Sequence, residues 1–134
     1  MFRFTAILLF FCFAKPSAAQ SVDFYNLYFD GNGLLSKGEY DKAIAKYNQA
    51  LKLNTADYVY FNRGNAYYGK KDYQNAISDY NKALQLNNEY REAYYQRALA
   101  KQNAGDKAGS CDDFKKASKM KMDDASAALK KYCK

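Results

Sequence analysis

Few side chains in this 134-residue chain could do chemistry, and they do not form a catalytic set. The sequence has no histidine, which removes the most common general base and the most common metal ligand. Ser110 therefore has no histidine to activate it as a nucleophile. The pairs Asp112-Asp113 and Asp123-Asp124 stand beside lysines, and nothing indicates the cleft that a general acid needs. We expect no enzyme, no cofactor and no metal site, and a small hydrolase is the least favoured alternative.

The first nineteen residues are typical of a secretory signal peptide. Arg3 gives a positive start, residues 6–14 (AILLFFCFA) are apolar, and residues 17–19 supply the small side chains that a signal peptidase reads. An uncleaved anchor is disfavoured because this apolar run is too short to span a bilayer. Acylation of Cys12 is disfavoured because it lies inside the run. We predict cleavage after residue 19, export to a periplasm or the outside medium, and no stable membrane insertion afterwards.

Cleavage would leave residues 20–134 with two of the three cysteines, Cys111 and Cys133. An even pair in an exported protein favours a disulfide, and two free thiols in a reducing compartment are the alternative. Without a CxxC pair or a lone reactive thiol, a catalytic redox role is not indicated. Loss of two basic residues would lower the net charge from +7 to about +5. Export disfavours nucleic acid as a partner.

The elements that position these residues are best seen in residues 60–86 (YFNRGNAYYGKKDYQNAISDYNKALQL). Apolar and small residues recur there at spacings of three and four, which places them on one face of each of two short helices. Asp72, after a glycine and two lysines, is typical of the N-cap of the second helix. One such hairpin cannot bury both of its apolar faces, so it needs copies to stack against.

Copies are present at a period of 33 to 34 residues. Ala76, Tyr80 and Ala83 of the middle copy correspond to Ala43, Tyr47 and Ala50 before it and to Ser110, Phe114 and Ala117 after it. The glycine of the first helix recurs as Gly31, Gly64 and Ala98. The pattern predicts helices near 24–37, 40–53, 57–70, 73–86, 91–104 and 107–120, and a last helix near 123–132 that Asp123 or Asp124 could cap.

This pattern resembles the tetratricopeptide repeat (TPR) family of stacked helical hairpins. The resemblance implies an all-α, right-handed superhelical solenoid of three antiparallel helix-turn-helix repeats at about 24–56, 57–90 and 91–124, with a capping helix at about 123–133. Some positions depart from the family pattern. The leucine before the glycine is replaced by Asp30, Arg63 and Arg97, the final proline is missing, and Lys101 stands where an aromatic is usual.

Repeat register also bears on the cysteines. Cys111 corresponds to Ile44 and Ile77, which we expect to face the next element along the stack. For the third copy that element is the last helix, which bears Cys133, so the register favours a bridge between the two.

In the TPR family, ligands contact the concave face that is lined by the first helix of each repeat. The resemblance therefore implies a non-catalytic scaffold that binds a peptide or partner helix through Tyr and Asn side chains on that face. The alternative is an assembly module of a cell-envelope complex that uses the convex face or stacks end to end. The implied concave residues are Tyr25, Tyr28, Asn32, Leu35, Tyr58, Phe61, Asn62, Asn65, Tyr68, Glu92, Tyr95, Gln96 and Leu99.

Some members of the family hold the C-terminal carboxylate of chaperones between two Asn, two Lys and an Arg. Asn32 and Asn62 match the Asn places, but the basic places hold Tyr28, Glu92 and Gln96. We therefore do not expect binding of chaperone tails.

Lysines make the C-terminal end of the chain basic. They could meet anionic lipid, an acidic polymer or an acidic protein patch, but interspersed aspartates favour a solvated helix face on charge pattern alone. The lysines are Lys115, Lys116, Lys119, Lys121, Lys130, Lys131 and Lys134.

Overall fold

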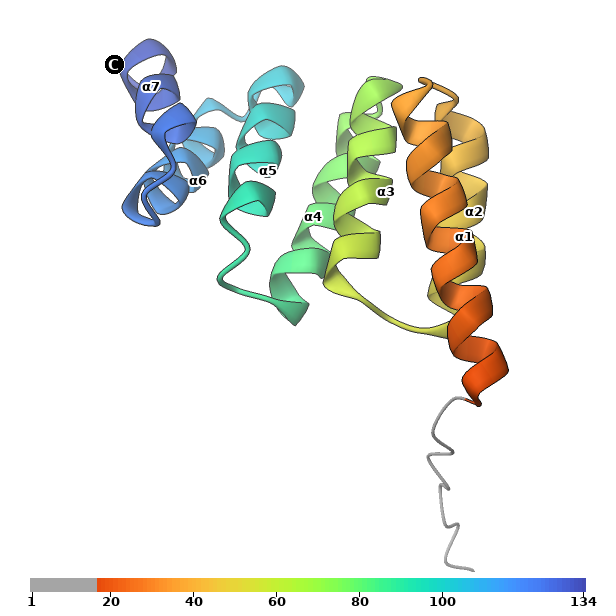
Figure 1. Ribbon diagram of the computed structural model, residues 1–134. Helices are drawn as coiled ribbons and strands as arrows, with labels where there is room; N and C mark the ends of the chain where they lie inside the picture. Colours follow the sequence, from red (N-terminus) through yellow and green to blue (C-terminus); the bar gives the residue numbers. More distant parts are fainter. Residues whose placement is uncertain (1–16) are drawn as a thin grey trace, which may run out of the picture.

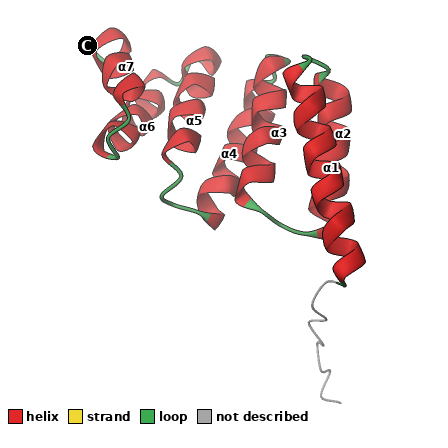
Figure 2. Ribbon diagram, in the orientation of Figure 1, coloured by secondary structure: helices red, strands yellow, loops and turns green. Residues whose placement is uncertain are grey.

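The computed structural model describes residues 17–134, which form seven α-helices and no strand (Figures 1 and 2). The all-α prediction is confirmed. The predicted signal peptide falls mostly on residues 1–16, which lie outside the described residues. The helices are α1 (Ala18–Ser36), α2 (Tyr40–Leu53), α3 (Asp57–Gly69), α4 (Tyr73–Leu86), α5 (Arg91–Ala104), α6 (Lys107–Lys119) and α7 (Asp123–Tyr132).

Helix bounds agree with the predicted ones to within a residue, except at the start of α1. We expected that helix near residue 24, but it begins at Ala18. The reason is a capping box, in which Ser17 accepts from the backbone N–H of Gln20 at 3.3 Å and donates its own N–H to the Gln20 side chain at 3.1 Å. The small residues of the proposed cleavage site therefore lie at the first turn of α1.

The turn inside each hairpin places one residue in the left-handed region, where glycine is favoured. The φ angle is +73° at Gly38, +64° at Lys71 and +91° at Gly105. Next to this residue, a backbone N–H returns to a carbonyl of the last helical turn, as Asp72 does to Tyr67 at 2.9 Å. These turns reverse the chain sharply, so the two helices of each hairpin pack antiparallel.

Two cap predictions had different outcomes. Asp72 caps α4 as predicted, since its side chain accepts from the backbone N–H of Asn75 at 3.2 Å. The cap of α7 was predicted wrongly. Met122 holds the N-cap position, and Asp123 and Asp124 lie in the first turn, where they complement the positive end of the helix dipole.

One large ring fills the centre of each hairpin. Tyr47, Tyr80 and Phe114 are fully buried, together with the alanines that the repeat pattern predicted as core. Gly31 and Gly64 lie against the first two rings, and a β-carbon on Gly64 would stand 2.7 Å from a ring carbon of Tyr80. The glycines therefore allow the two helices of a hairpin to approach closely.

Arginines explain the departure from the family pattern before the glycine. Arg63 forms a two-pronged pair with the carboxylate of Asp79 in α4, with both N···O distances at 2.7 Å, and also donates to Asn48 of the preceding hairpin at 2.7 Å. Arg97 repeats this arrangement with Asp113 and Asn81. These pairs join the helices of one hairpin and link it to the hairpin before.

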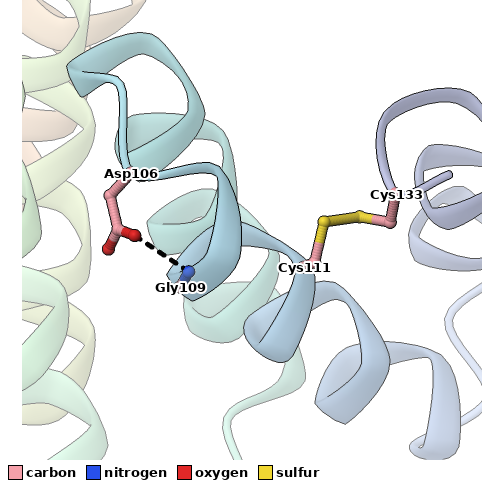
Figure 3. The surroundings of a disulfide bond; sticks show 4 residues. All are labelled: Asp106, Gly109, Cys111 and Cys133. Carbon is pink, nitrogen blue, oxygen red and sulfur yellow. Dashed lines mark hydrogen bonds between the residues drawn. A yellow bond between two sulfur atoms is a disulfide. The ribbon is translucent and has the colours of Figure 1, made fainter.

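The hairpins stack in chain order, and α7 packs on α6 at the end of the row (Figure 1). Ile44 is buried in a cluster with residues of α3, and Ile77 packs against Ala100 of α5, as the register predicted. Cys111, at the same register in α6, is joined to Cys133 just past α7, with Cα atoms 5.7 Å apart (Figure 3). That this bond forms in the native compartment stays a prediction.

Candidate partner-binding surface

The first helices of the three hairpins bring four of the predicted concave residues to one shallow pocket of about 430 Å³. α1 supplies Leu35, α3 supplies Asn65 and Tyr68, and α5 supplies Gln96. Two further residues complete the lining and were not predicted: Tyr40, at the start of α2, and Gly69, at the end of α3. Their contact could have been found from the sequence only by relating the end of one repeat to the turn of the preceding one.

Asparagines on this face are partly engaged within the protein. The Oδ1 atom of Asn32 accepts from the hydroxyl of Tyr47 at 2.7 Å and from the amide of Asn62 at 2.9 Å. Asn62 also donates to the hydroxyl of Tyr28 at 3.1 Å. These contacts fix Asn62 between α1 and α3, so its main role is to hold the surface in shape.

Other amide groups stay open to a ligand. Asn65 accepts from the buried hydroxyl of Tyr80 at 2.7 Å, which orients its amide, while its N–H₂ group has no partner among the described residues. Gln96 makes no side-chain hydrogen bond within residues 17–134. Because an amide can both donate and accept, these two groups could pair with the backbone of an extended peptide.

Several predicted aromatics serve mainly as packing. The ring of Tyr28 lies 4.9 Å from that of Tyr58, and Phe61 lies 4.7 Å from Tyr90, centroid to centroid. Tyr95 packs against Phe114 at 5.7 Å. Such aromatic pairs hold the helices at fixed separations, and only the exposed edges of these rings could contact a ligand.

The exposed aromatic surface lies on α1. Tyr25 is 50% exposed and Phe29 is 63% exposed, and their rings stack with centroids 6.5 Å apart. Phe29 was missed in the sequence analysis. The repeat period could have found it, because Phe29 holds in α1 the place that Asn62 holds in α3 and Gln96 holds in α5.

Glu92 does not line the shallow pocket between α1, α3 and α5, which we call the central pocket. It lines a separate hollow with Tyr90 and Met120, and Arg91 donates to its carboxylate at 2.9 Å. This hydrogen bond lowers the pKa of Glu92. The residues that line the central pocket include no cation that would attract an acidic peptide.

At its far end the concave side reaches α7. Tyr95 of α5 and Asp124, Lys131 and Tyr132 of α7 line a hollow of about 230 Å³ there. Burial raises the pKa of Tyr95, and the nearby carboxylate of Asp124 adds to this effect. The hydroxyl of Tyr95 therefore stays protonated at neutral pH and can donate a hydrogen bond.

The described residues contain neither a cluster of metal ligands nor a membrane-spanning helix. Within residues 17–134, no three His, Cys, Asp or Glu side chains come together as a metal ion would require. None of the described helices has the length and apolar character to cross a membrane. The concave face and the outer surface of the stack remain as the places where a partner could bind.

Comparisons with known proteins identify the family. The profile described as tetratricopeptide repeat matches residues 58–90, and the profile described as TPR repeat matches residues 31–71. The chain is a tetratricopeptide repeat protein. No curated protein matches the TPR chain in sequence.

Solved TPR domains share the fold along most of the chain. The first TPR domain of Spaghetti (RPAP3), bound to the HSP90 peptide SRMEEVD, is 27% identical over 84% of this chain and 91% of its own, with a TM-score of 0.80. The second TPR domain of human RPAP3, in complex with the HSP70 peptide SGPTIEEVD, is 24% identical over 86% and 98%, also with a TM-score of 0.80. A TPR-like protein from Chlorobium tepidum is 25% identical over 76% and 80%, with a TM-score of 0.67.

These likenesses support the right-handed stack of three TPR hairpins and a final helix that the sequence predicted. Two of these neighbours are described with a bound HSP70 or HSP90 peptide, which supports a protein-interaction scaffold as the class of function.

Proposed function

We propose that the concave TPR face binds an extended, uncharged segment of a partner protein. The observation that carries this proposal is the central pocket, where open amides of Asn65 and Gln96 lie beside the ring of Tyr68. An extended backbone could pair with the amides while its side chains lie on the exposed aromatic surface of Tyr25 and Phe29.

The proposed ligand differs in charge from the peptides bound by the structurally similar TPR domains, because the concave face here lacks the basic residues that an acidic peptide needs. The peptide SRMEEVD bound by the Spaghetti domain contains three acidic residues. Here the places for basic residues are filled by Tyr28, Glu92 and Gln96, and the matching Asn32 and Asn62 bond to each other. A carboxylate-rich segment would lose its hydration without gaining a cation, so we expect it to be rejected.

A selection from a random peptide library on the purified protein tests this proposal. We expect the selected peptides to be rich in apolar and amide side chains and poor in Asp and Glu. Replacing Tyr25, Phe29 and Gln96 by alanine should weaken their binding at least about tenfold, since truncation of an aromatic anchor commonly costs more than 1 kcal/mol. These three side chains are at least partly exposed, so the fold should survive.

The matched control replaces Leu53 and Leu86 by alanine. Both are exposed apolar residues at the ends of second helices, away from the concave face. This variant should bind the selected peptides with wild-type affinity, and the peptide SRMEEVD should not bind either protein. Tight binding of SRMEEVD, or an equal loss in the control, would contradict the proposed ligand.

We also propose that the protein acts in an exported compartment after loss of residues 1–19. The charged start, apolar run and small residues at 17–19 support this proposal. N-terminal sequencing of the protein from the exported fraction should begin at Gln20. A chain that keeps Met1 and stays inside the cell would show that the segment is no signal peptide.

A further inference from the structure

The excess of positive over negative charge in residues 20–134 is confined to residues 91–134. Residues 20–56 and 57–90 each carry four acidic and four basic side chains, whereas residues 91–134 carry six acidic and eleven basic ones. The first two repeats are therefore neutral, and the whole excess of about five charges lies on α5, α6, α7 and the residues between them. Charged residues that served only to keep the surface hydrated would be spread evenly over the three repeats.

Ion pairing concentrates this excess further. Asp113 is buried and is held by both Arg97 at 2.6 Å and Lys101 at 2.8 Å, so it neutralises nothing at the surface. None of the eight lysines after Lys101 forms an ion pair with another described residue. The exposed carboxylates of Asp112, Asp123 and Asp124 lie on the same helices and offset only part of this charge.

Two links between α6 and α7 hold the lysines of both helices on one rigid unit. The disulfide places Cys111 opposite Cys133 (Figure 3). The hydroxyls of Ser118 and Ser126 lie 2.7 Å apart. The two helices therefore run antiparallel, and Lys130 lies at the level of Lys115. Each of these lysines is exposed.

The lysines on α6 leave the concave face free. α6 is the second helix of its hairpin, and Lys115 and Lys119 are one turn apart on its exposed side. By the repeat period, Lys115 holds the place of Asn48 and Asn81, the residues that receive the arginine of the next hairpin. No arginine follows in the chain, so the Lys115 ammonium has no such partner.

We propose that this lysine surface, formed by Lys115, Lys119, Lys130 and Lys134 with their neighbours, binds the anionic headgroups of a lipid membrane. Its composition favours lipid over an acidic protein. Protein interfaces are enriched in arginine and depleted in lysine, whereas the basic residues of this surface are all lysines, with no arginine after Arg97. Lysine is a flexible point charge that suits a diffuse layer of headgroups.

Tyr132 and Lys131 do not belong to this surface, because they line the hollow with Tyr95 on the concave side. The protein would then lie on the membrane through α6 and α7, and its concave face would stay open to a partner.

Sedimentation with lipid vesicles tests this proposal. The purified protein is mixed with vesicles of phosphatidylcholine and phosphatidylglycerol in equal amounts, and with vesicles of phosphatidylcholine alone as the control for apolar insertion. We expect binding only to the anionic vesicles, and its loss when salt is raised to about 1 M, where charges are screened within about 3 Å.

Matched charge variants locate the surface. Replacing Lys115, Lys119, Lys130 and Lys134 by glutamine should weaken binding at least about a hundredfold, because each lysine near an anionic surface contributes roughly fivefold. The control variant replaces the exposed and unpaired Lys37, Lys52, Lys71 and Lys82 and removes the same charge from the neutral repeats. This control variant should lose far less affinity for the anionic vesicles.

The proposal is wrong if the two variants lose equal affinity, or if the wild-type protein ignores anionic vesicles. Binding of soluble polyglutamate in place of vesicles would assign the surface to an acidic protein and would also overturn it. Peptide binding in the groove is measured separately, so a failure here leaves the proposed function unaffected.

Discussion

The carboxylates of Asp79 and Asp113 are buried, and each pairs with an arginine from the first helix of its own hairpin; Asp113 also pairs with Lys101. In the first hairpin the same two places hold Asp30 and Lys46, so the charges are exchanged between the helices, and the pair lies at the surface. The hydrogen bonds from Arg63 to Asp79 raise the pKa of Arg63, which keeps the guanidinium charged at every accessible pH.

Asp79→Asn tests the buried pair. Because the change leaves the Arg63 charge buried without its counter-ion, we expect it to lower the free energy of unfolding by about 3 to 5 kcal/mol. Asp30→Asn is the control. It removes the same charge from the exposed pair, whose side chains are 58% and 36% exposed, and should cost less than about 1 kcal/mol. Urea denaturation measures both, and equal losses would contradict the role of the buried pair.

Gly64→Ala tests the close contact inside the middle hairpin. The new β-carbon would stand 2.7 Å from a ring carbon of the fully buried Tyr80, and the ring has no space to move into. We expect a loss of about 1 to 3 kcal/mol. The control is Gly33→Ala in α1, two residues after Gly31, the equivalent of Gly64. Its β-carbon would have no atom within 4 Å.

At Gly33 the better helix propensity of alanine should raise stability by up to about 1 kcal/mol. Thermal unfolding followed by circular dichroism separates the two variants. If both glycine variants change stability in the same direction, then the contact with Tyr80 is not what selects glycine at position 64.

At the scale of the elements, the two ends of the stack differ. α1 exposes Asn26 and Gly33 on the side where α3 buries Val59 and Ala66 against the hairpin before it. By helical spacing the same side of α1 carries Val22 and Phe29, which are 57% and 63% exposed, so this end of the stack leaves apolar side chains uncovered. The other end is covered by α7, which packs on α6 through Ala128.

The disulfide between Cys111 and Cys133 should stabilise α7 against detachment. The bond closes a loop of 22 residues in sequence separation, which corresponds to about 3 kcal/mol in the chain-entropy account. Replacing both cysteines by serine should therefore lower the unfolding midpoint clearly, and replacing Cys133 alone should have the same effect. Alkylation of the exported protein without reductant should label neither cysteine. Labelling of both would mean that the native protein keeps free thiols.

Most of the helices could be predicted because period and turn chemistry agree. The ring of Tyr80, the small residue at Gly64 and the cap at Asp72 each indicate the same hairpin, and the copies repeat them in register. The start of α1 was missed because its capping box pairs Gln20 with Ser17, and the signal-peptide interpretation set Ser17 apart from the fold.

The candidate site was less predictable than the fold. Repeat positions indicate which side a residue faces, but they do not show whether its polar atoms are already paired. Asn62 and Asn65 look equivalent in sequence, yet the amide of Asn62 is used between α1 and α3 whereas that of Asn65 is open. The arginines before the glycine were noted only as departures from the family pattern, because their partners lie sixteen residues away on another helix.

At the scale of the whole molecule, the account assigns one role to each side of the stack. The first helices α1, α3 and α5, with their aromatic and amide side chains, would hold a partner segment, and α6 with α7 would hold the protein on a membrane. The two roles do not compete, because the pocket is lined by the first helices and the lysines lie on α6 and α7.

Site-specific photo-crosslinking in the native compartment tests the central claim most directly. A photoreactive phenylalanine analogue replaces Tyr68, whose ring lines the pocket, or Ser78, which is exposed on the second helix α4. We predict a discrete crosslinked partner from position 68 and none from position 78. A partner captured from position 78 but not from position 68 would contradict binding in the groove.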